Sequence, residues 1–496
     1  MAETGTDIPR SQVAQRQAET GTGPRGAGDG SGMAVTAEVG GAAVLYEPVI
    51  DPAGDLPAAP QRSFLRQVLH DTFNQLGAQL GSVWILIIAF CAVIAPYVAS
   101  SHPILMKADG RWSSPMWHSL TPADLLLTGV AIAIFVLWLR RRTSFGEGLV
   151  VILAVVALVG PLAYVFKSAP STVNYQHYRD LERQGRVQFI LRTLVPYSPI
   201  DRMRDMPERR LTPPLAARWL GDATTTDGET VHGIIDRQNG LLVVKTPNGD
   251  RVLQNDQVKS VQYMPASLLN CNWLGTETDG ADLLSRMLHA TRIALSIGLI
   301  STSISITIGI LIGGLMGYFV GKVDLFGMRL IEIFQAIPIL LVLITVMTAW
   351  GERNIYVMMI TIGLLSWTGT ARFIRAEFLR LREQDFVHAA VASGLPQWMV
   401  IYRHILPNGL TPVLVTATFG VAAAILLEST LSFLGLGLID EPSWGQMLNQ
   451  ARSGGQGFVW WMAIFPGAAI FLTVYAYALI GDAIRDAIDP KLRKRE

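Results

Sequence analysis

A few side chains in this sequence could do chemistry, and their spacing decides which chemistry is open to them. Glu332 and Glu428 belong to separate predicted spans, and no partner for paired-acid or nucleophile-and-base catalysis is visible for either. His388 and His404 are not at i, i+4 spacing and have no third metal ligand nearby. A hydrolytic or metal-assisted site needs such groups to converge, so we expect no catalytic residue and no metal site.

The cysteines and glycines exclude two further kinds of site. Cys91 lies in an apolar run and Cys271 in a distant polar stretch, which indicates neither a disulfide framework nor a thiolate metal site. Gly321-Lys322 lacks both the upstream glycine and the following hydroxyl residue of a phosphate-binding loop. We therefore expect no ATP or other cofactor on this chain.

The composition points to the membrane. Of 496 residues, 50% are hydrophobic and only 16% are charged, against roughly 25% charged in soluble proteins. Forty basic residues nearly balance thirty-nine acidic ones, so whole-chain charge gives no reason to expect a nucleic-acid partner. A plain soluble enzyme is excluded.

Eight apolar runs approach the roughly 20 residues that cross a bilayer. They are residues 83–99, 125–139, 149–165, 293–320, 333–350, 355–374, 410–431 and 459–480. The second and third runs are short and flank Arg140, Arg141 and Arg142, so the alternative for them is a buried soluble helix pair. The pattern predicts an all-α polytopic membrane protein of about eight transmembrane helices.

Basic residues give the expected orientation. If the eight spans alternate, the basic clusters fall on one side: Arg62, Arg66, Arg140, Lys322, Arg329, the loop 372–403, Arg485 and Lys491. Cytoplasmic loops are enriched in such residues, so both termini are expected in the cytoplasm. Residues 1–61 have no apolar period and predict a disordered cytoplasmic tail, and residues 486–496 form a basic tail.

The polar region 167–289 is then extracytoplasmic, and part of it is expected to be β-structure. Short β-branched runs at 230–235, 241–246, 251–254 and 258–263 are separated by Asn239-Gly240 and Asn248-Gly249. Asn-Gly between such runs is a strong hairpin signal. We expect a four-stranded meander or small barrel at about 228–265. No catalytic cluster accompanies it, which favours a docking or spacer module.

The loop 375–408 is the segment with the clearest functional pattern. It predicts two short helices broken at Gly394 and Pro396, with Ala389, Ala390 and Ala392 on a packing face and charge on the other. Such a surface can seat in another protein's groove. The alternative is an ordinary solvated loop.

This loop resembles the EAA motif of ABC-importer permeases. The residues at the motif's spacing are Ala389, Ala390, Gly394, Leu406 and Pro407, with Asp385 shortly before them. The sequence departs from the general pattern at His388, in the place of the motif's Glu, and at His404, in the place of its usual Ile.

Other stretches are similar to the C-type permease subunit of dipeptide and oligopeptide (peptide/nickel) importers. Residues 274–286 read Leu-Gly-Thr-Glu-Thr-Asp-Gly-Ala-Asp-Leu-Leu-Ser-Arg, and 317–324, 428–437, 444–448 and 481–490 also match. The extracytoplasmic motif residues are Gly275, Thr276, Asp279, Gly280, Asp282, Trp444 and Gly445. Ala281 departs from the family, which usually has Arg there.

The resemblance implies a type I ABC importer transmembrane domain in a prokaryotic plasma (inner) membrane. It covers residues 62–100 and 270–490, with a core of five spans at 290–485, and leaves out an extra hairpin (101–166) and the extracytoplasmic insert (167–289). The implied partners are a second permease, two nucleotide-binding ATPases that hold ATP and Mg²⁺, an extracytoplasmic solute-binding protein and membrane lipid.

Two details of the spans stay open at this point. Glu428 either contacts passing solute or holds the Gly-rich segment after it by hydrogen bonds. Gly309, Gly313, Gly314 and Gly317 have the spacing of a close helix contact.

An ATP-independent channel or a secondary transporter is the alternative function. Such a transporter would be expected to contain two similar halves, and no second copy of a half is visible in the sequence.

Overall fold

The computed structural model describes residues 37–39, 42–44, 64–140, 145–166, 175, 177–184, 186–202, 210–215, 220–238, 241–246, 249–263, 272–351, 354–438, 441–453 and 458–488. The chain divides into two units, Met1–Gln61 and Arg62–Glu496. In the first, β1 (Ala37–Val39) pairs antiparallel with β2 (Ala42–Val44), where the sequence predicted no regular structure. The rest of the expected disordered tail, 1–61, and the basic tail after 488 lie outside the described residues.

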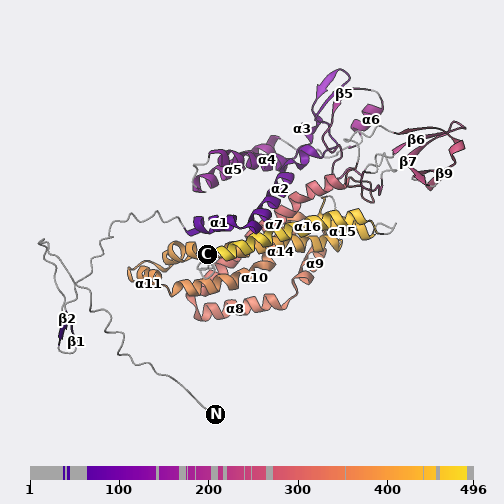
Figure 1. Cartoon of the computed structure of the whole chain (residues 1–496). Helices are drawn as coiled ribbons and strands as arrows, with labels where there is room; N and C mark the ends of the chain where they lie inside the picture. The colour runs from indigo at the N-terminus through magenta and orange to yellow at the C-terminus, as the bar shows by residue number, and fades with distance from the viewer. Residues whose placement is uncertain are drawn as a thin grey trace, which may run out of the picture. The chain divides into compact units, whose positions relative to one another are not determined.

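The second unit is mostly helical (Figure 1). Its helices before the long core are α1 (Phe64–Asn74), α2 (Leu76–Val98), α3 (Pro115–Ser119), α4 (Pro122–Arg140), α5 (Phe145–Phe166) and α6 (His177–Arg183). The core contains α7 (Leu283–Phe319), α8 (Gly321–Ala336), α9 (Ile339–Trp350), α10 (Ile355–Arg382), α14 (Val413–Phe433), α15 (Trp444–Ser453) and α16 (Trp460–Ile488). Between α10 and α14 lie α11 (Asp385–Ala392), α12 (Gln397–Met399), a π-helical turn η4 (Val400–Ile405) and α13 (Leu406–Gly409).

Within the described residues, seven helices are long and apolar enough to cross a membrane: α2, α4, α5, α7, α10, α14 and α16. The pair α8 and α9 makes an eighth if it is counted as one span, and it is bent by 74°. The expectation of a continuous span at 333–350 is therefore wrong. Pro338 lies at the break; it has no N–H for the helix ladder and disfavours helical backbone at Ile337 before it.

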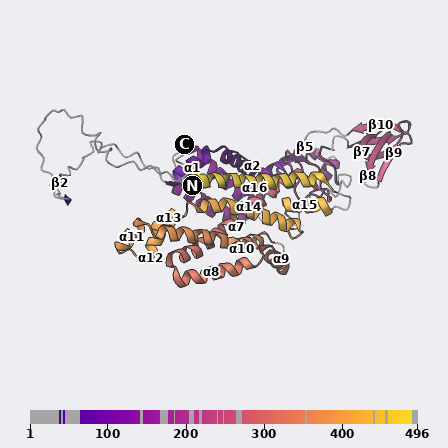
Figure 2. The same ribbon diagram turned by 60° about the horizontal axis from the view of Figure 1, so that its bottom comes forward.

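Glycines let the core helices approach closely, as the sequence predicted for α7. A Cβ added to Gly309 would lie 2.6 Å from the Cβ of Thr370 on α10, and one on Gly313 would lie 2.3 Å from the Ala371 carbonyl oxygen. Any larger residue at these positions would push α7 and α10 apart. Figure 2 shows α16, α14 and α10 running alongside one another in the bundle.

The extra hairpin is formed by α4 and α5. These helices pack closely, because a Cβ on Gly160 would be 3.0 Å from Leu126 Cδ1. Two polar contacts join α4 to the core: the hydroxyls of Tyr97 and Thr128 lie 2.9 Å apart, and Arg292 of α7 pairs with Asp124. The hairpin is thus attached near the start of α4.

Two small sheets lie among the polar segments. One has the order β4-β3-β5, from β3 (Leu105–Ala108), β4 (Arg111–Ser113) and β5 (Val187–Leu191), and was not predicted. The other has the order β10-β6-β7-β8-β9 and is antiparallel throughout. Its strands are β6 (Leu220–Thr225), β7 (Thr230–Gln238), β8 (Leu241–Thr246), β9 (Gly249–Leu253) and β10 (Val258–Tyr263), and a short 3-10 turn, η3 (Asn255–Gln257), precedes β10. The predicted four strands are present, but the prediction missed β6, so the sheet begins at 220 rather than 228.

Candidate functional site

The loop between α10 and α14 folds as a compact helical hairpin, as predicted. Val387 and Ala390 of α11 and Val400 and Ile405 of η4 are buried against Phe378 near the end of α10. The Arg382 Nη1 donates to the Tyr318 carbonyl at the end of α7 (3.0 Å). Arg382 is the last residue of α10, so this bond joins α10 to α7. The hairpin itself packs in an apolar cluster with Phe378 of α10, against which Tyr318 of α7 also packs, so it is not loosely solvated.

The turn between α11 and α12 requires glycine. Gly394 has φ +77°, a left-handed conformation that side chains with a Cβ rarely adopt, and Leu395 N–H donates to the Ala390 carbonyl (3.3 Å) across it. A Cβ on Gly394 would meet nothing within 4 Å. The constraint at Gly394 is therefore the backbone conformation and not a lack of space.

The three alanines of α11 do not share one face. Ala390 is only 6% exposed and belongs to the hairpin's own core, whereas Ala389 and Ala392 are exposed. Asp385 and His388 are exposed on the same helix, and in α13 Leu406 is half-buried and Pro407 exposed. Of the predicted small-residue face, only Ala389 and Ala392 are available to another protein.

Sequence reasoning missed the largest exposed apolar side chains of this hairpin. We call them the loop face: Phe386, Val391, Trp398 and Tyr402. Trp398 is 66% and Tyr402 70% exposed. Charged residues lie among them, including the exposed Asp385 and Arg403. The sequence did contain a signal for this surface, since Trp398 and Tyr402 are bulky aromatic residues in an otherwise charged loop.

The motif segment 272–282 forms a tight structure before α7. The Thr276 Oγ1 accepts from the Thr212 N–H (2.9 Å), and the Thr276 N–H donates to the Thr212 carbonyl (3.0 Å). Gly275 has φ +86°, and a Cβ there would lie 2.7 Å from the Thr212 carbonyl oxygen. Gly280 also has φ +86°, and a Cβ there would lie 2.8 Å from the Arg202 carbonyl oxygen. These glycines are needed for close contact with segments before the five-stranded sheet.

Two acids anchor this segment to α7. Asp282 caps the helix, because its Oδ2 accepts from Ser285 N–H (2.8 Å), while its Oδ1 accepts from Asn272 Nδ2 (2.7 Å). Glu277, which was not predicted, is fully buried with Arg286 Nε 2.8 Å from its Oε1. Burial raises the pKa of Glu277 to about 7, although Arg286 acts in the opposite direction. Asp279 is more exposed and lies 3.8 Å from Arg202.

Trp444, Gly445 and Glu428 form the neighbouring part of the site. Trp444 is buried and its Nε1 donates to the Met287 carbonyl (3.4 Å). The Glu428 carboxylate is buried and accepts from Ser432 (2.7 Å) and Ser429 (3.3 Å). A Cβ on Gly445 would lie 2.2 Å from the Ser429 carbonyl oxygen. These contacts favour the structural role for Glu428 over contact with solute.

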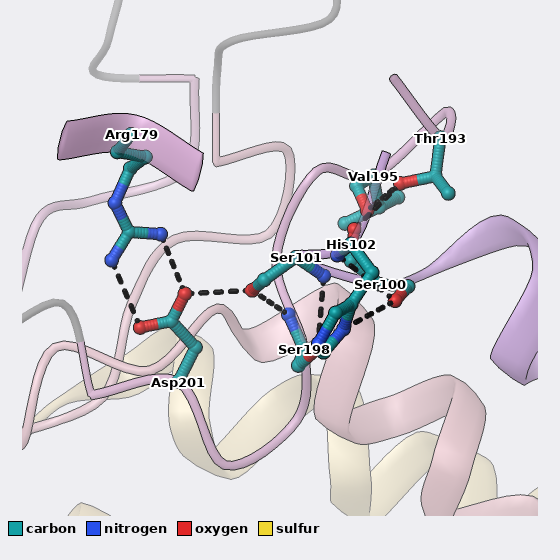
Figure 3. Close-up of polar contacts among 8 residues, drawn as sticks. All are labelled: Ser100, Ser101, His102, Arg179, Thr193, Val195, Ser198 and Asp201. Carbon is teal, nitrogen blue, oxygen red and sulfur yellow. Dashed lines mark hydrogen bonds and ion pairs between the residues drawn. The ribbon is translucent and has the colours of Figure 1, made fainter. Parts of the chain in front are cut away.

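A cluster of Ser, His and Asp side chains follows α2 (Figure 3). Asp201 holds Arg179 at 2.6 Å and Ser101 at 2.7 Å, and the Ser100 hydroxyl lies 3.5 Å from His102 Nδ1. Burial lowers the pKa of His102, although the charge of Asp201 acts in the opposite direction. This cluster joins the segment after α2 to residues 193–201.

The structure keeps the two predicted groups of site residues apart. The motif segment precedes the first residue of α7, and the helical hairpin lies in the apolar cluster against which Tyr318, near the last residue of α7, packs. Among the described residues, no three His, Cys, Asp or Glu side chains come together as metal ligands.

Comparison with known proteins identifies what the chain resembles. The family described as "Binding-protein-dependent transport system inner membrane component" matches residues 309–494. The oligopeptide transport system permease protein OppC of Haemophilus influenzae is 41% identical over 224 residues, which are 45% of this chain and 71% of that protein. The dipeptide permease DppC of Bacillus subtilis is 37% identical over 45% of this chain and 70% of its own length.

Two further similarities were found. The glutathione transport system permease protein GsiD of Pectobacterium atrosepticum is 37% identical over 45% of this chain and 74% of its own length. Among solved structures, an inward-facing MetNI methionine ABC transporter matches 42% of this chain and 98% of that chain, at 17% identity and a TM-score of 0.34.

Proposed function

Because this chain belongs to the binding-protein-dependent transport system inner membrane components, with oligopeptide and dipeptide permeases as its relatives, we propose that it forms half of the translocation pathway of an ATP-driven importer. A second permease subunit supplies the other half. Two cytoplasmic ATPase subunits bind ATP and Mg²⁺, an extracytoplasmic solute-binding protein delivers the solute, and this chain holds no cofactor. The names of the relatives support a short peptide or peptide-like cargo.

The proposed orientation places both termini and the helical hairpin α11–α13 in the cytoplasm. Arg372, Arg375, Arg380, Arg382 and Arg403 are concentrated around the hairpin, and such concentrations mark cytoplasmic loops. The motif segment and the five-stranded sheet then belong to the extracytoplasmic side, where a solute-binding protein would reach them.

The observation that carries the proposal is the packed hairpin with its exposed loop face. A pore in one chain can be driven by ATP hydrolysis in another only through a surface that moves with both. The hairpin packs in an apolar cluster with Phe378 of α10, against which Tyr318 of α7 also packs, and it presents Trp398 and Tyr402 outward. Aromatic side chains of this kind dominate protein interfaces. We assign this surface to the contact with the ATPase.

Cysteine crosslinking tests this assignment with a matched pair of neighbouring alanines. Ala389 is exposed and Ala390 is 6% exposed, so only the first presents its side chain to a partner. In membranes containing the whole complex, Ala389→Cys treated with a short thiol-to-amine crosslinker should link to the ATPase and not to the solute-binding protein. Ala390→Cys should give little product. Linkage of Ala389→Cys to the solute-binding protein, or to no subunit, would contradict the assignment.

A further inference from the structure

The small sheet β4-β3-β5 presents a row of exposed aromatic and apolar side chains. Lys107 of β3 lies directly opposite Trp112 of β4 and Phe189 of β5, so all three project from one face of the sheet. Leu191 projects from the same face, because it is opposite Leu105, two residues before Lys107. The sheet face, as we call it, consists of Lys107, Trp112, Phe189 and Leu191. Trp112 is 59% exposed, Phe189 46% and Leu191 47%.

The side chains of the sheet face contact one another. The ring centres of Trp112 and Phe189 are 5.8 Å apart, and Lys107 Nζ lies 5.6 Å from the centre of the Trp112 ring. A cation at this distance from a Trp ring is attracted to it. The opposite face of the sheet differs, since Met106, which projects from it, is only 5% exposed. The sheet thus buries side chains on one side and leaves an aromatic surface uncovered on the other.

Hydrogen bonds fix the sheet close to the end of a spanning helix. α2 ends at Val98, whose carbonyl accepts from the Val195 N–H (2.9 Å), and the Ser100 N–H donates to the Val195 carbonyl (3.1 Å). Leu191 is four residues before Val195, so it lies within about 14 Å of this point. The 23 residues of α2 make about 34 Å of helix, slightly more than the roughly 30 Å of hydrocarbon in a bilayer. The sheet face is therefore near the level at which α2 leaves the hydrocarbon.

The next spanning helix begins beside the same sheet. β4 ends at Ser113 and α4 begins at Pro122, and between them the Met116 N–H of α3 donates to the Pro103 carbonyl just before β3 (3.1 Å). In Figure 1, β5 and α3 lie at the end of the bundle where α4 begins. Leu194, between the sheet face and the end of α2, is 57% exposed. The exposed apolar surface thus continues from the sheet face toward helices that lipid surrounds.

We propose that the sheet face lies on the extracytoplasmic surface of the bilayer, with Trp112, Phe189 and Leu191 inserted at the level of the phospholipid headgroups. Trp is enriched at this level, because its ring is apolar while its N–H can remain in contact with water. Lys suits the same level, since its alkyl chain covers apolar surface and its amino group reaches water or phosphate. An apolar face with an adjacent basic residue is how interfacial elements bind phospholipid.

This lipid contact goes beyond the proposed function. The sheet lies outside residues 309–494, which the family model matches, so the contact belongs to an additional segment of this chain. Only the side of the membrane follows from the proposed orientation. The contact itself depends on neither the solute nor the ATPase.

The test measures the depth of a fluorescent dye on a single cysteine in the full-length protein, reconstituted in vesicles of phosphatidylethanolamine and phosphatidylglycerol. Cys91 and Cys271 are first replaced by serine, and Leu191→Cys then carries the dye on the sheet face. The lipids carry a nitroxide quencher either near the headgroup or near the end of the acyl chain.

Two exposed positions serve as matched controls. Ser113 of β4 is opposite Met106, so Ser113→Cys places the same dye on the other face of the same sheet. Val252 of β9 is 55% exposed and belongs to the five-stranded sheet. Val252→Cys therefore reports on an exposed apolar strand residue that is not part of the sheet face.

The dye at Leu191→Cys should lose fluorescence to the headgroup nitroxide more than to the chain-end nitroxide, since interfacial elements enter only about 5–10 Å. The dye at Ser113→Cys should lose clearly less, and the dye at Val252→Cys should be quenched by iodide in water and by neither lipid. Because all three positions are exposed, the melting temperatures should match that of the cysteine-free protein.

Three results would overturn the inference. Equal quenching at Leu191→Cys and Ser113→Cys would show that the sheet does not lie face down on the bilayer. Stronger quenching by the chain-end nitroxide would place the face in the hydrocarbon. Absence of lipid quenching at Leu191→Cys would leave the face to water, or to a protein if the dye's emission shifted only when purified solute-binding protein was added. None of these results would alter the proposed function, which the crosslinking of Ala389→Cys tests separately.

Discussion

The hydroxyls of Thr212 and Thr276 lie 2.9 Å apart, although 64 positions separate them in the sequence. The neighbouring backbone closes the same junction, because the Leu215 N–H donates to the Asn272 carbonyl (3.0 Å). The chain thus leaves this point after 215, forms the five-stranded sheet, and returns to the same point at 272. Pro213-Pro214 and the motif residues Leu274-Gly275, which the sheet separates in the sequence, are therefore adjacent in the fold.

The first prediction is that residues 216–271 can be replaced by a short Gly-Ser linker. Since the Leu215 N–H and the Asn272 carbonyl are already in contact, a linker of a few residues can join the two ends. A longer linker would add little entropic cost, because that cost grows only slowly with loop length. Membrane insertion, assembly and melting temperature should be unchanged, while the dependence of uptake on solute-binding-protein concentration should change. Deletion of 228–265 should lower the melting temperature more than the linker replacement does, because it leaves β6 without its partners β7 and β10.

A contrasting variant controls for damage to the junction itself. Thr276→Val removes the acceptor of the Thr212 N–H and should cost about 1–3 kcal/mol of stability. Uptake that is unchanged at every solute-binding-protein concentration after the linker replacement would exclude a docking role for the sheet.

The second prediction concerns the backbone at Gly394. Gly394→Val forces a β-branched residue to φ +77° and should cost about 1–3 kcal/mol locally, abolish uptake and weaken recovery of the ATPase with the membrane complex. Gly394→Asn should retain most activity, since Asn tolerates this conformation. The matched control is Gly351→Val, which has φ +74° and equally open surroundings but lies outside the hairpin. It should leave ATPase recovery normal. Equal recovery from the two valine variants would mean that the hairpin is not the coupling surface.

The third prediction is a pH dependence of stability from Glu277. Its pKa is raised from 4.5 to about 7, so between these values the folded state holds a proton that the unfolded state has lost. Stability should therefore fall as the pH rises from about 4.5 to about 7 and level off above. The charges facing Glu277 are Arg286, Asp279, Asp282 and Arg202.

Thermal unfolding of the detergent-solubilised complex across this pH range measures the effect. Glu277→Gln keeps the shape of the side chain and should flatten the dependence. An unaltered profile in Glu277→Gln would assign the dependence to another group.

The fourth prediction concerns the attachment of the extra hairpin. Asp124 is buried, accepts from the Thr121 N–H (2.6 Å) and pairs with Arg292. Asp124→Asn leaves Arg292 without its counter-charge and should cost about 3 kcal/mol or more. Replacing both as Asp124→Leu with Arg292→Met should recover part of that loss in melting temperature.

An exposed ion pair provides the comparison. Arg329 and Glu332, which lie 2.6 Å apart, are both more than half exposed, so Arg329→Met should cost no more than about 1 kcal/mol. If Asp124→Asn were as mild as Arg329→Met, the pair would not hold the hairpin.

The fifth prediction tests the orientation. Gly146, near the start of α5, and Asp227, between β6 and β7, are both exposed. In intact cells an impermeant thiol reagent applied from outside should label Asp227→Cys and spare Gly146→Cys. Labelling of Gly146→Cys would contradict the eight-span topology and leave a six-span core.

The sequence was most informative where structure depends on local pattern. Apolar runs located the spans, and Gly394 marked the hairpin turn, because hydrophobicity and left-handed backbone are local properties. The bend at Pro338 was missed because the apolar pattern continues through it. β6 was missed because Gly221 and Asp222 have low β-propensity.

What depends on distant partners could not be read from the sequence. β3 pairs with β5 through contacts such as Leu105 with Leu191, and nothing near either residue indicates the other. Ala390 is buried and Ala389 exposed because Phe378 of α10 packs against one side of α11, so two adjacent alanines have different roles.

The length of α7 has a mechanical consequence. Its 37 residues make a rod of about 55 Å, nearly twice the roughly 30 Å hydrocarbon thickness. A tilt of about 10° about one end of such a rod displaces the other end by about 10 Å. The motif segment is bonded to one end through Asp282, and at the other end Tyr318 packs against the apolar cluster that includes the helical hairpin. Under the proposed function, a small rotation of this one helix would convert a modest movement at the ATPase contact into a displacement large enough to open or close a path for solute.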